Sequence, residues 1–249
     1  MKVINKKIFS RKPKAILIDI DNTLYAYEPA HKSAIAAVAE KLNLELSIDR
    51  RFFTSHYESA RIEVKQRLGK TASSHSRLLY MQMVLERLGL GTQPLLCLDM
   101  EQTYWRAFLR QATLFDNVMD FLDDCRVVGV PVVAVTDLTS QIQFRKLVYF
   151  GIDHFFQFVV TSEESGCDKP GSASFLLALQ KCDVKEGLVW MIGDDLAKDI
   201  SGAKDSINAA TLHKASGFGL PSSESVADAR FRDFKELRAF LDALASDVW

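Results

Sequence analysis

Three short apolar runs, each leading into acidic or hydroxyl residues, constrain the fold of this chain more than any other feature. They span residues 15–20 (Ala-Ile-Leu-Ile-Asp-Ile), 130–135 and 188–192. Runs that are rich in Val and Ile and too short for helices are typical of strands buried on both faces of a parallel sheet. Helical patterns lie between and after them, such as the i, i+3, i+4, i+7 apolar spacing that starts at Phe115. This alternation predicts an α/β fold with a doubly wound, Rossmann-like parallel-sheet core.

Residues 29–110 have a different pattern. They contain no convincing strand, and long helical stretches span residues 29–42, 49–68, 74–88 and 94–109. Gly, Ser and Thr, which commonly end helices, separate the stretches at 69–73 and 89–93. The pattern predicts a helical subdomain of residues 25–112, inserted into an α/β domain that residues 1–24 and 113–249 form.

Each apolar run leads into a polar cluster. The clusters are Asp19-Ile20-Asp21-Asn22-Thr23, Thr136-Asp137 and Gly193-Asp194-Asp195, with Asp199 shortly after the last. Because open α/β sheets bind ligands at the carboxyl ends of their strands, we expect these side chains to meet in one crevice. Converging carboxylates repel one another, and a divalent cation that prefers hard oxygen ligands, such as Mg²⁺, relieves that repulsion.

Four short segments resemble, in order and spacing, the motifs of the haloacid dehalogenase (HAD) superfamily. They are Asp19-Ile20-Asp21-Asn22-Thr23-Leu24, Thr136, Lys169-Pro170 and Gly193-Asp194, with Asp199 five positions after Asp194. The resemblance covers essentially the whole chain. Within the superfamily, the chain is most similar to small-molecule phosphatases with a helical cap after the first motif, such as phosphoglycolate phosphatases, pyrimidine nucleotidases and N-acylneuraminate phosphatases. The resemblance implies that residues 25–112 are the cap and that the rest is the catalytic core.

The resemblance also implies a role for each motif, and the chemistry supports these roles. Asp19 would attack phosphorus and form an aspartyl-phosphate. Asp21 would protonate the leaving oxygen and then deprotonate the attacking water, which requires a second carboxyl close to the first. The Thr136 hydroxyl, the backbone N–H of Asp137 and the positive charge of Lys169 would bind the phosphoryl group.

By the same resemblance, Mg²⁺ is the cofactor, and it would be held by Asp19, the backbone carbonyl of Asp21 and Asp194. Asp199 would either bind a water molecule on the metal or orient Lys169.

Two acidic positions depart from the pattern of many relatives. Asp137 and Leu138 stand where relatives carry Asn-Gly, so the extra carboxylate either weakens phosphate binding or points outward. Asp195 stands where relatives often have Ser, Thr or Asn, and it has either a structural role or a role beside the metal.

A basic segment lies within the predicted cap. Between residues 61 and 77 the only acidic residue is Glu63, against five basic residues, which are Arg61, Lys65, Arg67, Lys70 and Arg77. Arg67 and Arg77 are candidates for contacts to the part of the substrate that is not phosphate. The alternative is a solvated helix face.

These features predict a Mg²⁺-dependent phosphatase that hydrolyses a small-molecule phosphate monoester through an aspartyl-phosphate intermediate. Within the superfamily, Asp21 argues against dehalogenases and phosphonatases, which lack an acid at that position. A phosphomutase or phosphotransferase keeps the acid and remains an alternative. A non-catalytic binding module with the same fold is a second alternative, against which the complete motif set counts.

The composition limits the kinds of partner that the protein can have. The 31 Lys and Arg residues balance 32 Asp and Glu residues, and this net charge of -1 argues against a dedicated nucleic-acid-binding protein. We find neither the roughly 20-residue apolar run of a membrane span nor the apolar stretch of a signal peptide. We therefore expect a cytoplasmic enzyme, a monomer or homodimer, whose partner is a small phosphorylated metabolite.

Overall fold

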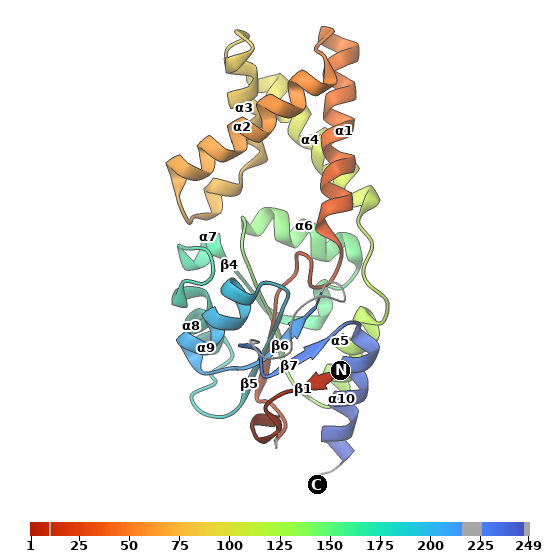
Figure 1. Cartoon of the computed structure of the whole chain (residues 1–249), viewed down its shortest axis with the longest axis vertical. Helices are drawn as coiled ribbons and strands as arrows, with labels where there is room; N and C mark the ends of the chain where they lie inside the picture. Colours follow the sequence, from red (N-terminus) through yellow and green to blue (C-terminus); the bar gives the residue numbers. More distant parts are fainter. Residues whose placement is uncertain (10, 216–225, 247–249) are drawn as a thin grey trace. The chain divides into compact units, whose positions relative to one another are not determined.

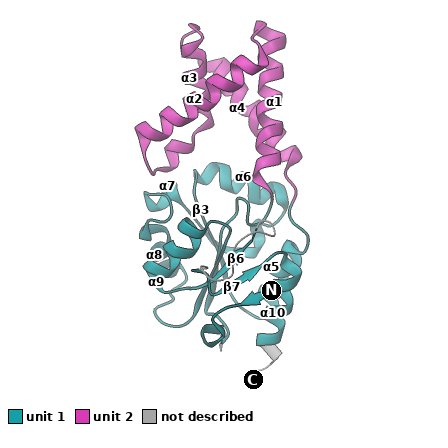
Figure 2. Cartoon of the chain, in the orientation of Figure 1, with its two compact units in different colours: residues 1–25, 114–249 teal, residues 26–113 magenta. Residues whose placement is uncertain are grey.

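The computed structural model describes residues 1–9, 11–215 and 226–246 of the chain (Figure 1). It divides into two compact units, one formed by residues 1–25 and 114–249 and the other by residues 26–113 (Figure 2). The divisions predicted from the sequence fall after residues 24 and 112, one residue earlier in each case.

The described part of the first unit contains a seven-stranded sheet in the order β1-β7-β6-β5-β2-β3-β4. The strands are β1 (Lys2–Val3), β2 (Ala15–Ile18), β3 (Val132–Thr136), β4 (Phe156–Thr161), β5 (Val189–Gly193), β6 (Ala210–Lys214) and β7 (Ala229–Phe231). All neighbours are parallel except β1 and β7. The three predicted strands are β2, β3 and β5, which are adjacent in the sheet. The prediction of a doubly wound α/β core is confirmed.

Helices cover both faces of this sheet. They are α5 (Val118–Val127), α6 (Ser140–Phe150), α7 (Ser162–Ser165), α8 (Ser172–Lys181), α9 (Gly202–Ile207) and α10 (Phe234–Ser246). On one face, Leu17 and Met191 pack in a cluster with Phe175 of α8 and Ala203 of α9. On the other face, Trp190 stacks on Phe240 of α10, with ring centroids 5.7 Å apart. Burial of successive strand residues on opposite faces explains why these runs are continuously apolar.

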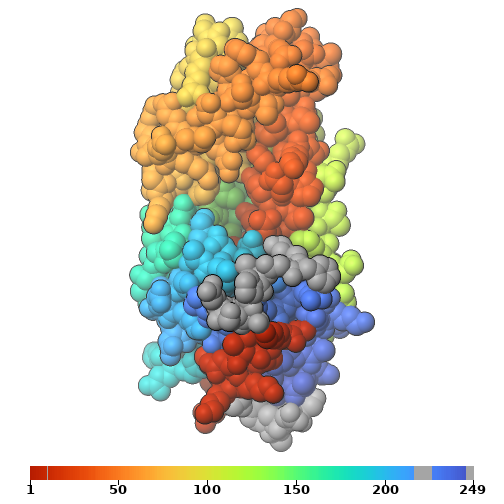
Figure 3. All heavy atoms as spheres, viewed as in Figure 1, coloured from red at the N-terminus to blue at the C-terminus, as the bar shows by residue number. Residues whose placement is uncertain are grey.

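The start of the chain lies against its last described part. The β1 residues Lys2 and Val3 pair with Arg230 and Ala229 of β7, and the Met1 amino group lies 2.8 Å from the Glu236 carboxylate. Figure 3 shows the red N-terminal segment beside the blue C-terminal one. A strand of two residues has no detectable periodicity, and its position follows from this pairing.

The second unit is helical. Its helices are α1 (Tyr27–Leu46), α2 (Arg50–Leu68), α3 (Arg77–Arg87) and α4 (Pro94–Gln111). The third begins three residues later than the predicted stretch 74–88, because the Ser76 side chain accepts a hydrogen bond from Leu79 N at 3.3 Å and caps the helix there. Aromatic side chains fill the interior, among them the buried Tyr57, Tyr80, Tyr104 and Phe108.

The ends of the α/β unit that flank the helical insertion are next to each other. Tyr25 and Leu114 form an isolated antiparallel bridge, and Phe115 N donates to Leu24 O at 2.9 Å. The chain therefore leaves and re-enters the α/β unit at one place.

Among the described residues, no helix combines the length and the apolarity needed to span a bilayer.

Candidate active site

The carboxyl ends of β2, β3 and β5 bring the motif residues together. The sheet register pairs Ile18 with Ala134 of β3 and with Ile192 of β5. Asp19 N donates to Ile192 O at 2.9 Å, which fixes the chain where it leaves β2. Asp19, Thr136 and Asp194 therefore follow or end three adjacent strands, as parallel pairing requires.

A buried lysine links two of the acidic residues. Lys169 Nζ lies 2.7 Å from Asp19 Oδ1, 2.6 Å from Asp199 Oδ1 and 2.9 Å from Val135 O. Burial disfavours the charged ammonium, but the Asp19 and Asp199 carboxylates outweigh it and raise the pKa of Lys169. Lys169 is therefore a fixed positive charge beside the predicted nucleophile.

Three carboxylates form a group that could hold a metal ion. One oxygen each from Asp19, Asp194 and Asp199 lies within 4.8 Å of the others. Burial raises the pKa of Asp19 to about 7 and that of Asp194 to about 6. The neighbouring carboxylates add to this increase, and the positive charge of Lys169 opposes it without cancelling it. An oxygen-rich, under-neutralised site fits a hard divalent cation such as Mg²⁺.

Two further residues support this acidic group. Thr23 Oγ1 donates to Asp19 Oδ2 at 3.1 Å and lies 3.4 Å from Asp194 Oδ1, so it holds these carboxylates in place. A Cβ atom at Gly193 would overlap the Asp199 carboxylate, so glycine is required at this position. Asp199 contacts Lys169 directly, which is one of the two roles expected for it.

The extra acid Asp137 is neutralised within the α/β unit. Its Oδ1 accepts from Lys169 N at 2.9 Å, and its Oδ2 lies 2.7 Å from Lys198 Nζ. The adjoining Leu138 has a φ of 84°, a left-handed conformation that is costly for a side chain with a Cβ. Leu138 therefore keeps the backbone conformation that a glycine would adopt at this position. The added negative charge of Asp137 is neutralised by Lys198.

Asp195 has a local structural contact. Its Oδ1 accepts from Ala197 N and Lys198 N, both at 2.9 Å, and so caps the helical turn Leu196–Ser201. This is the structural one of the two roles considered for Asp195.

Asp21 has three partners that the sequence motifs do not identify. Lys146 Nζ lies 2.6 Å and 2.9 Å from its two carboxylate oxygens. Tyr25 donates its hydroxyl to Oδ1, and Gln143 Nε2 lies 3.3 Å from Oδ2. Burial alone would raise the pKa of Asp21, but Lys146 and these hydrogen bonds lower it below the ordinary value.

A sequence signal for two of these partners did exist. Gln143 and Lys146 share a helical face with Leu147, which is buried, and Phe150, which is half-buried, at i, i+3, i+4, i+7 spacing. Lysine and glutamine are mostly exposed, so polar residues in an apolar stripe indicate either a helix end or a paired polar site.

The two candidate arginines of the helical unit have unlike surroundings. Arg67 is exposed, with Nη2 2.6 Å from Glu63 of the same helix. Arg77 is buried, and its guanidinium donates to His75 O at 2.6 Å and to the Tyr27 hydroxyl. The solvated-face interpretation fits Arg67, whereas Arg77 belongs to the aromatic interior. Substrate contacts by either residue stay a prediction.

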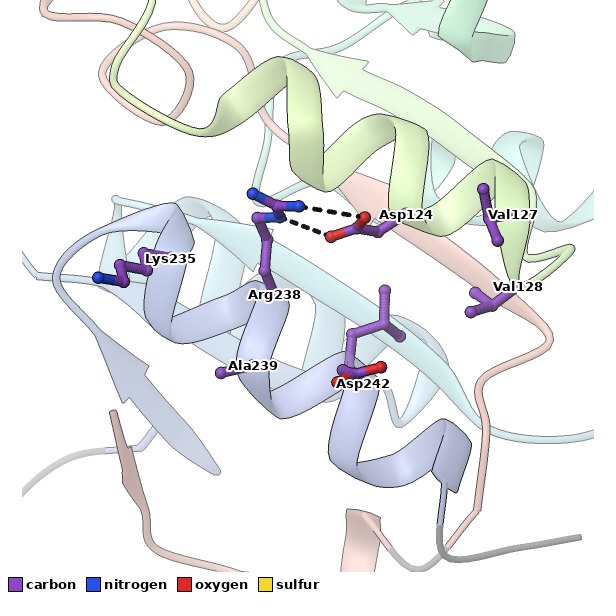
Figure 4. A pocket seen from close by; sticks show the side chains of 8 residues that line it. Asp124, Val127, Val128, Lys235, Arg238, Ala239 and Asp242 are labelled. Atoms are coloured by element: carbon purple, nitrogen blue, oxygen red, sulfur yellow. Dashed lines mark hydrogen bonds and ion pairs between the residues drawn. The ribbon is translucent and has the colours of Figure 1, made fainter.

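A hollow of about 430 Å³ lies between α5 and α10 and contains none of the motif residues (Figure 4). Arg238 crosses it and bonds to Asp124 at 2.6 Å and 3.4 Å. An ion pair between two helices accounts for this arrangement.

Comparisons with known proteins agree with the geometry. The family model for haloacid dehalogenase-like hydrolases matches residues 13–206. The chain is 37% identical over 190 residues to a ribulose-1,5-bisphosphate 5-phosphatase of Halopiger xanaduensis, covering 76% of this chain and 80% of the relative. It is 32% identical over 194 residues to a glyceraldehyde 3-phosphate phosphatase of Methanopyrus kandleri, covering 76% and 79%.

The fold extends to enzymes with other reactions. The crystal structure of a 2-haloacid dehalogenase from Pseudomonas syringae pv. Tomato aligns over 93% of this chain and 99% of that chain, with a TM-score of 0.72 and 19% identity. At that identity the likeness concerns the fold alone.

The family match covers most of the chain, and the motif residues meet at the expected end of the sheet. The protein belongs to the haloacid dehalogenase-like hydrolases. The relatives that share about three quarters of its length are phosphatases.

Proposed function

We propose that this hydrolase is a Mg²⁺-dependent phosphatase that cleaves a small phosphate monoester through an aspartyl-phosphate on Asp19. The observation that carries the proposal is the pairing of the buried Asp19 carboxylate with Lys169 at 2.7 Å, beside a second acid, Asp21, two residues along the chain. A nucleophile next to a fixed cation and a separate acid/base are the groups that phosphoryl transfer through a covalent intermediate requires.

In the first step, the Asp19 carboxylate attacks phosphorus and the ester oxygen leaves. Asp21 gives that oxygen a proton, which it must hold when the substrate is bound although Lys146 lowers its pKa in the free protein. Thr136 and the N–H of Asp137 donate to phosphoryl oxygens. Lys169 offsets the negative charge of the nucleophile and the phosphoryl group. In the second step, ionised Asp21 takes a proton from water, which attacks phosphorus and restores Asp19.

Asp19 must be ionised to attack. Burial raises its pKa to about 7, which opposes ionisation, whereas the neighbouring Lys169 favours it. A Mg²⁺ ion bound by Asp19, Asp194 and the carbonyl of Asp21 would supply the remaining positive charge and neutralise the phosphoryl oxygens. This requirement explains why so many acids are kept within 4.8 Å of one another.

We further propose that the substrate is a small phosphorylated carbohydrate. The two relatives reported above are named for ribulose-1,5-bisphosphate and glyceraldehyde 3-phosphate, both phosphorylated sugars. Both candidates carry a primary alkyl phosphate, a poor leaving group whose departure depends on a general acid. We assign this role to Asp21, two residues from Asp19.

The test is phosphate release from these two compounds and from p-nitrophenyl phosphate, with Mg²⁺ and after exhaustive chelation. We expect release that EDTA abolishes and that added Mg²⁺ restores. Full activity after chelation would contradict the metal assignment. Transfer of phosphate to an added sugar phosphate, with no net release, would instead identify a mutase.

A second experiment tests the covalent route. The Asp21→Asn variant should form the aspartyl-phosphate from p-nitrophenyl phosphate faster than it hydrolyses it, because nitrophenol needs little protonation whereas water still needs a base. A burst of nitrophenol and a covalent mass increase on Asp19 are the expected readouts. Wild-type turnover of an alkyl phosphate by this variant would show that Asp21 is not the general acid.

A further inference from the structure

Helix α6 directs two polar side chains into the protein. Gln143 and Lys146 each have 0% of their surface exposed, and a spacing of three residues puts them on one helical face. Gln141 and Arg145, on the same helix, are exposed. A lysine is almost never fully buried unless a partner compensates its charge. The groups that Gln143 and Lys146 contact therefore indicate the role of this helical face.

The partner of Lys146 is the Asp21 carboxylate, which it contacts through both oxygens at 2.6 Å and 2.9 Å. The hydroxyl of Tyr25 donates to the same carboxylate. Contacts to both oxygens fix the rotation of the carboxylate as well as its position. Lys146 thus determines which way the predicted general acid/base points.

The partners of Gln143 determine the orientation of its amide. Its Nε2 lies 2.8 Å from Asp137 O, 2.7 Å from Thr136 Oγ1 and 3.3 Å from the Asp21 carboxylate. A carbonyl and an ionised carboxylate only accept hydrogen bonds, so the NH₂ group must face them.

Gln143 therefore donates to the Thr136 hydroxyl oxygen, and the hydroxyl hydrogen is available to another acceptor. The acceptor within reach is Asp137 O at 3.3 Å, a long contact that a phosphoryl oxygen would replace. Gln143 thus prepares Thr136 to donate to the substrate.

This arrangement costs stability. Gln143 Oε1 is buried and accepts no hydrogen bond from any described residue. An unsatisfied buried acceptor is destabilising, and an apolar side chain of similar length would avoid the cost. Local arrangements that reduce stability are expected at functional sites more than elsewhere.

We propose that Gln143 and Lys146 are positioning residues of the phosphoryl-transfer site, with Lys146 holding the Asp21 carboxylate and Gln143 orienting the Thr136 hydroxyl. The inference rests on the proposed function, because it assigns both residues to groups of that reaction. Neither residue reacts; each acts through the group that it contacts.

The Gln143→Met variant separates this role from a structural one. It should lower kcat/KM by roughly ten- to a hundred-fold and raise the Ki of inorganic phosphate, because Thr136 loses its orienting donor. It should leave Tm close to the wild-type value, because removal of the unsatisfied Oε1 offsets the loss of the Nε2 hydrogen bonds. Gln141→Met makes the same replacement on the exposed side of the helix and should behave as wild type. A fall in Tm that accompanies the loss of activity would overturn the assignment.

The Lys146→Met variant tests the hold on Asp21. In single-turnover experiments it should slow cleavage of an alkyl phosphate much more than cleavage of p-nitrophenyl phosphate, because only the alkyl ester depends on a well-placed acid. Lys146→Gln retains a donor and should recover part of the rate, and Arg145→Met is the matched exposed control. Equal slowing of both esters would overturn the assignment of Lys146.

Different results would overturn the proposed function and the positioning roles of Gln143 and Lys146. A wild-type protein that releases no phosphate from any ester would overturn the proposed function and this inference together. An active wild type with equally active Gln143→Met and Lys146→Met variants would overturn this inference alone. If Lys146→Met does not fold, the comparison of alkyl and aryl esters is made with Lys146→Gln, and equal rates have the same meaning.

Discussion

The α/β unit and the helical unit both bury positive charge, but they surround it with different chemistry. In the α/β unit, Lys169 lies between Asp19 and Asp199 at 2.7 Å and 2.6 Å. In the helical unit, the Arg77 guanidinium lies 5.4 Å to 5.7 Å from the centroids of three aromatic rings, which are those of Tyr80, Tyr104 and Trp105. Its hydrogen bonds go to a carbonyl and a phenol, both neutral.

The difference distinguishes a buried cation that takes part in a reactive site from one that only stabilises the fold. A cation between carboxylates belongs to a set whose protonation and metal content change, because each acid can gain a proton or a ligand. Aromatic rings hold a cation through their fixed quadrupoles and exchange nothing with solvent. We therefore expect substitutions in the first set to affect catalysis, and substitution of Arg77 to affect stability first.

The largest expected effect comes from Asp19→Asn, which keeps the volume of the side chain and removes the nucleophile. Activity should fall on the order of 10³-fold or more. The fold should persist, because a carboxyl whose pKa burial raises to about 7 gains by losing its charge. Phosphate release and thermal unfolding measure the two parts. If the variant kept more than about a tenth of the wild-type activity, Asp19 would not be the nucleophile and the α/β site would not be the reactive one.

The next effect concerns Arg77→Met. The loss of three cation–π contacts and two hydrogen bonds should reduce the free energy of unfolding by about 3 kcal/mol. Turnover of p-nitrophenyl phosphate by the folded fraction should change little.

Arg67→Met is the matched control for Arg77→Met, because it removes an exposed arginine paired with Glu63 and should change stability by less than about 0.5 kcal/mol. Denaturant unfolding of both variants gives the comparison. Similar stabilities for Arg77→Met and wild type would mean that the aromatic interior does not depend on the cation.

A smaller effect is the pH dependence of the stabilisation that Mg²⁺ provides. The folded-state pKa values of Asp19 and Asp194, about 7 and about 6, exceed those of ordinary carboxyls. Between about pH 4 and pH 7 these two carboxyls therefore bind more protons in the metal-free folded protein than in the unfolded chain, and their contribution to stability falls as pH rises. Mg²⁺ competes with these protons, so the increase in Tm that it causes should be larger at pH 7.5 than at pH 5.5. An equal increase at both pH values would show that Mg²⁺ does not bind these carboxylates.

The smallest effect should come from Asp195→Ala. This residue shows that a carboxylate next to the reactive set can have a purely local contact, since it caps the turn Leu196–Ser201. Loss of the cap should cost about 1 kcal/mol of stability with activity largely kept. Thermal unfolding and steady-state kinetics would measure both. A hundred-fold loss of activity would place Asp195 among the reactive carboxylates instead.

The elements that carry the site could be predicted from the sequence, and the outer ones could not. Strands β2, β3 and β5 are buried on both faces, so the sequence shows each as an unbroken apolar run. Strands β1 and β7 have two and three residues, too few for a pattern, and pair with each other across the whole length of the chain.

The site itself could be predicted only where its residues are fixed by the backbone. Asp19, Thr136 and Asp194 follow from strand ends, which parallel pairing aligns. The helical pattern could have marked Lys146 as buried, but not its partner, which is 125 positions away and which no local pattern encodes. The same holds for Lys198, whose ion pair neutralises Asp137.

The place where the helical unit joins the α/β unit has a consequence for how such enzymes diversify. Because Tyr25 bridges to Leu114, the 88-residue excursion of residues 26–113 begins and ends at one point of the sheet domain. An insertion whose ends already meet can lengthen, shrink or be exchanged while the parent domain keeps its own connections. Grafting the equivalent segment of a relative between residues 25 and 114 should therefore transfer substrate preference without rebuilding the chemistry, which makes this junction a natural site for recombination.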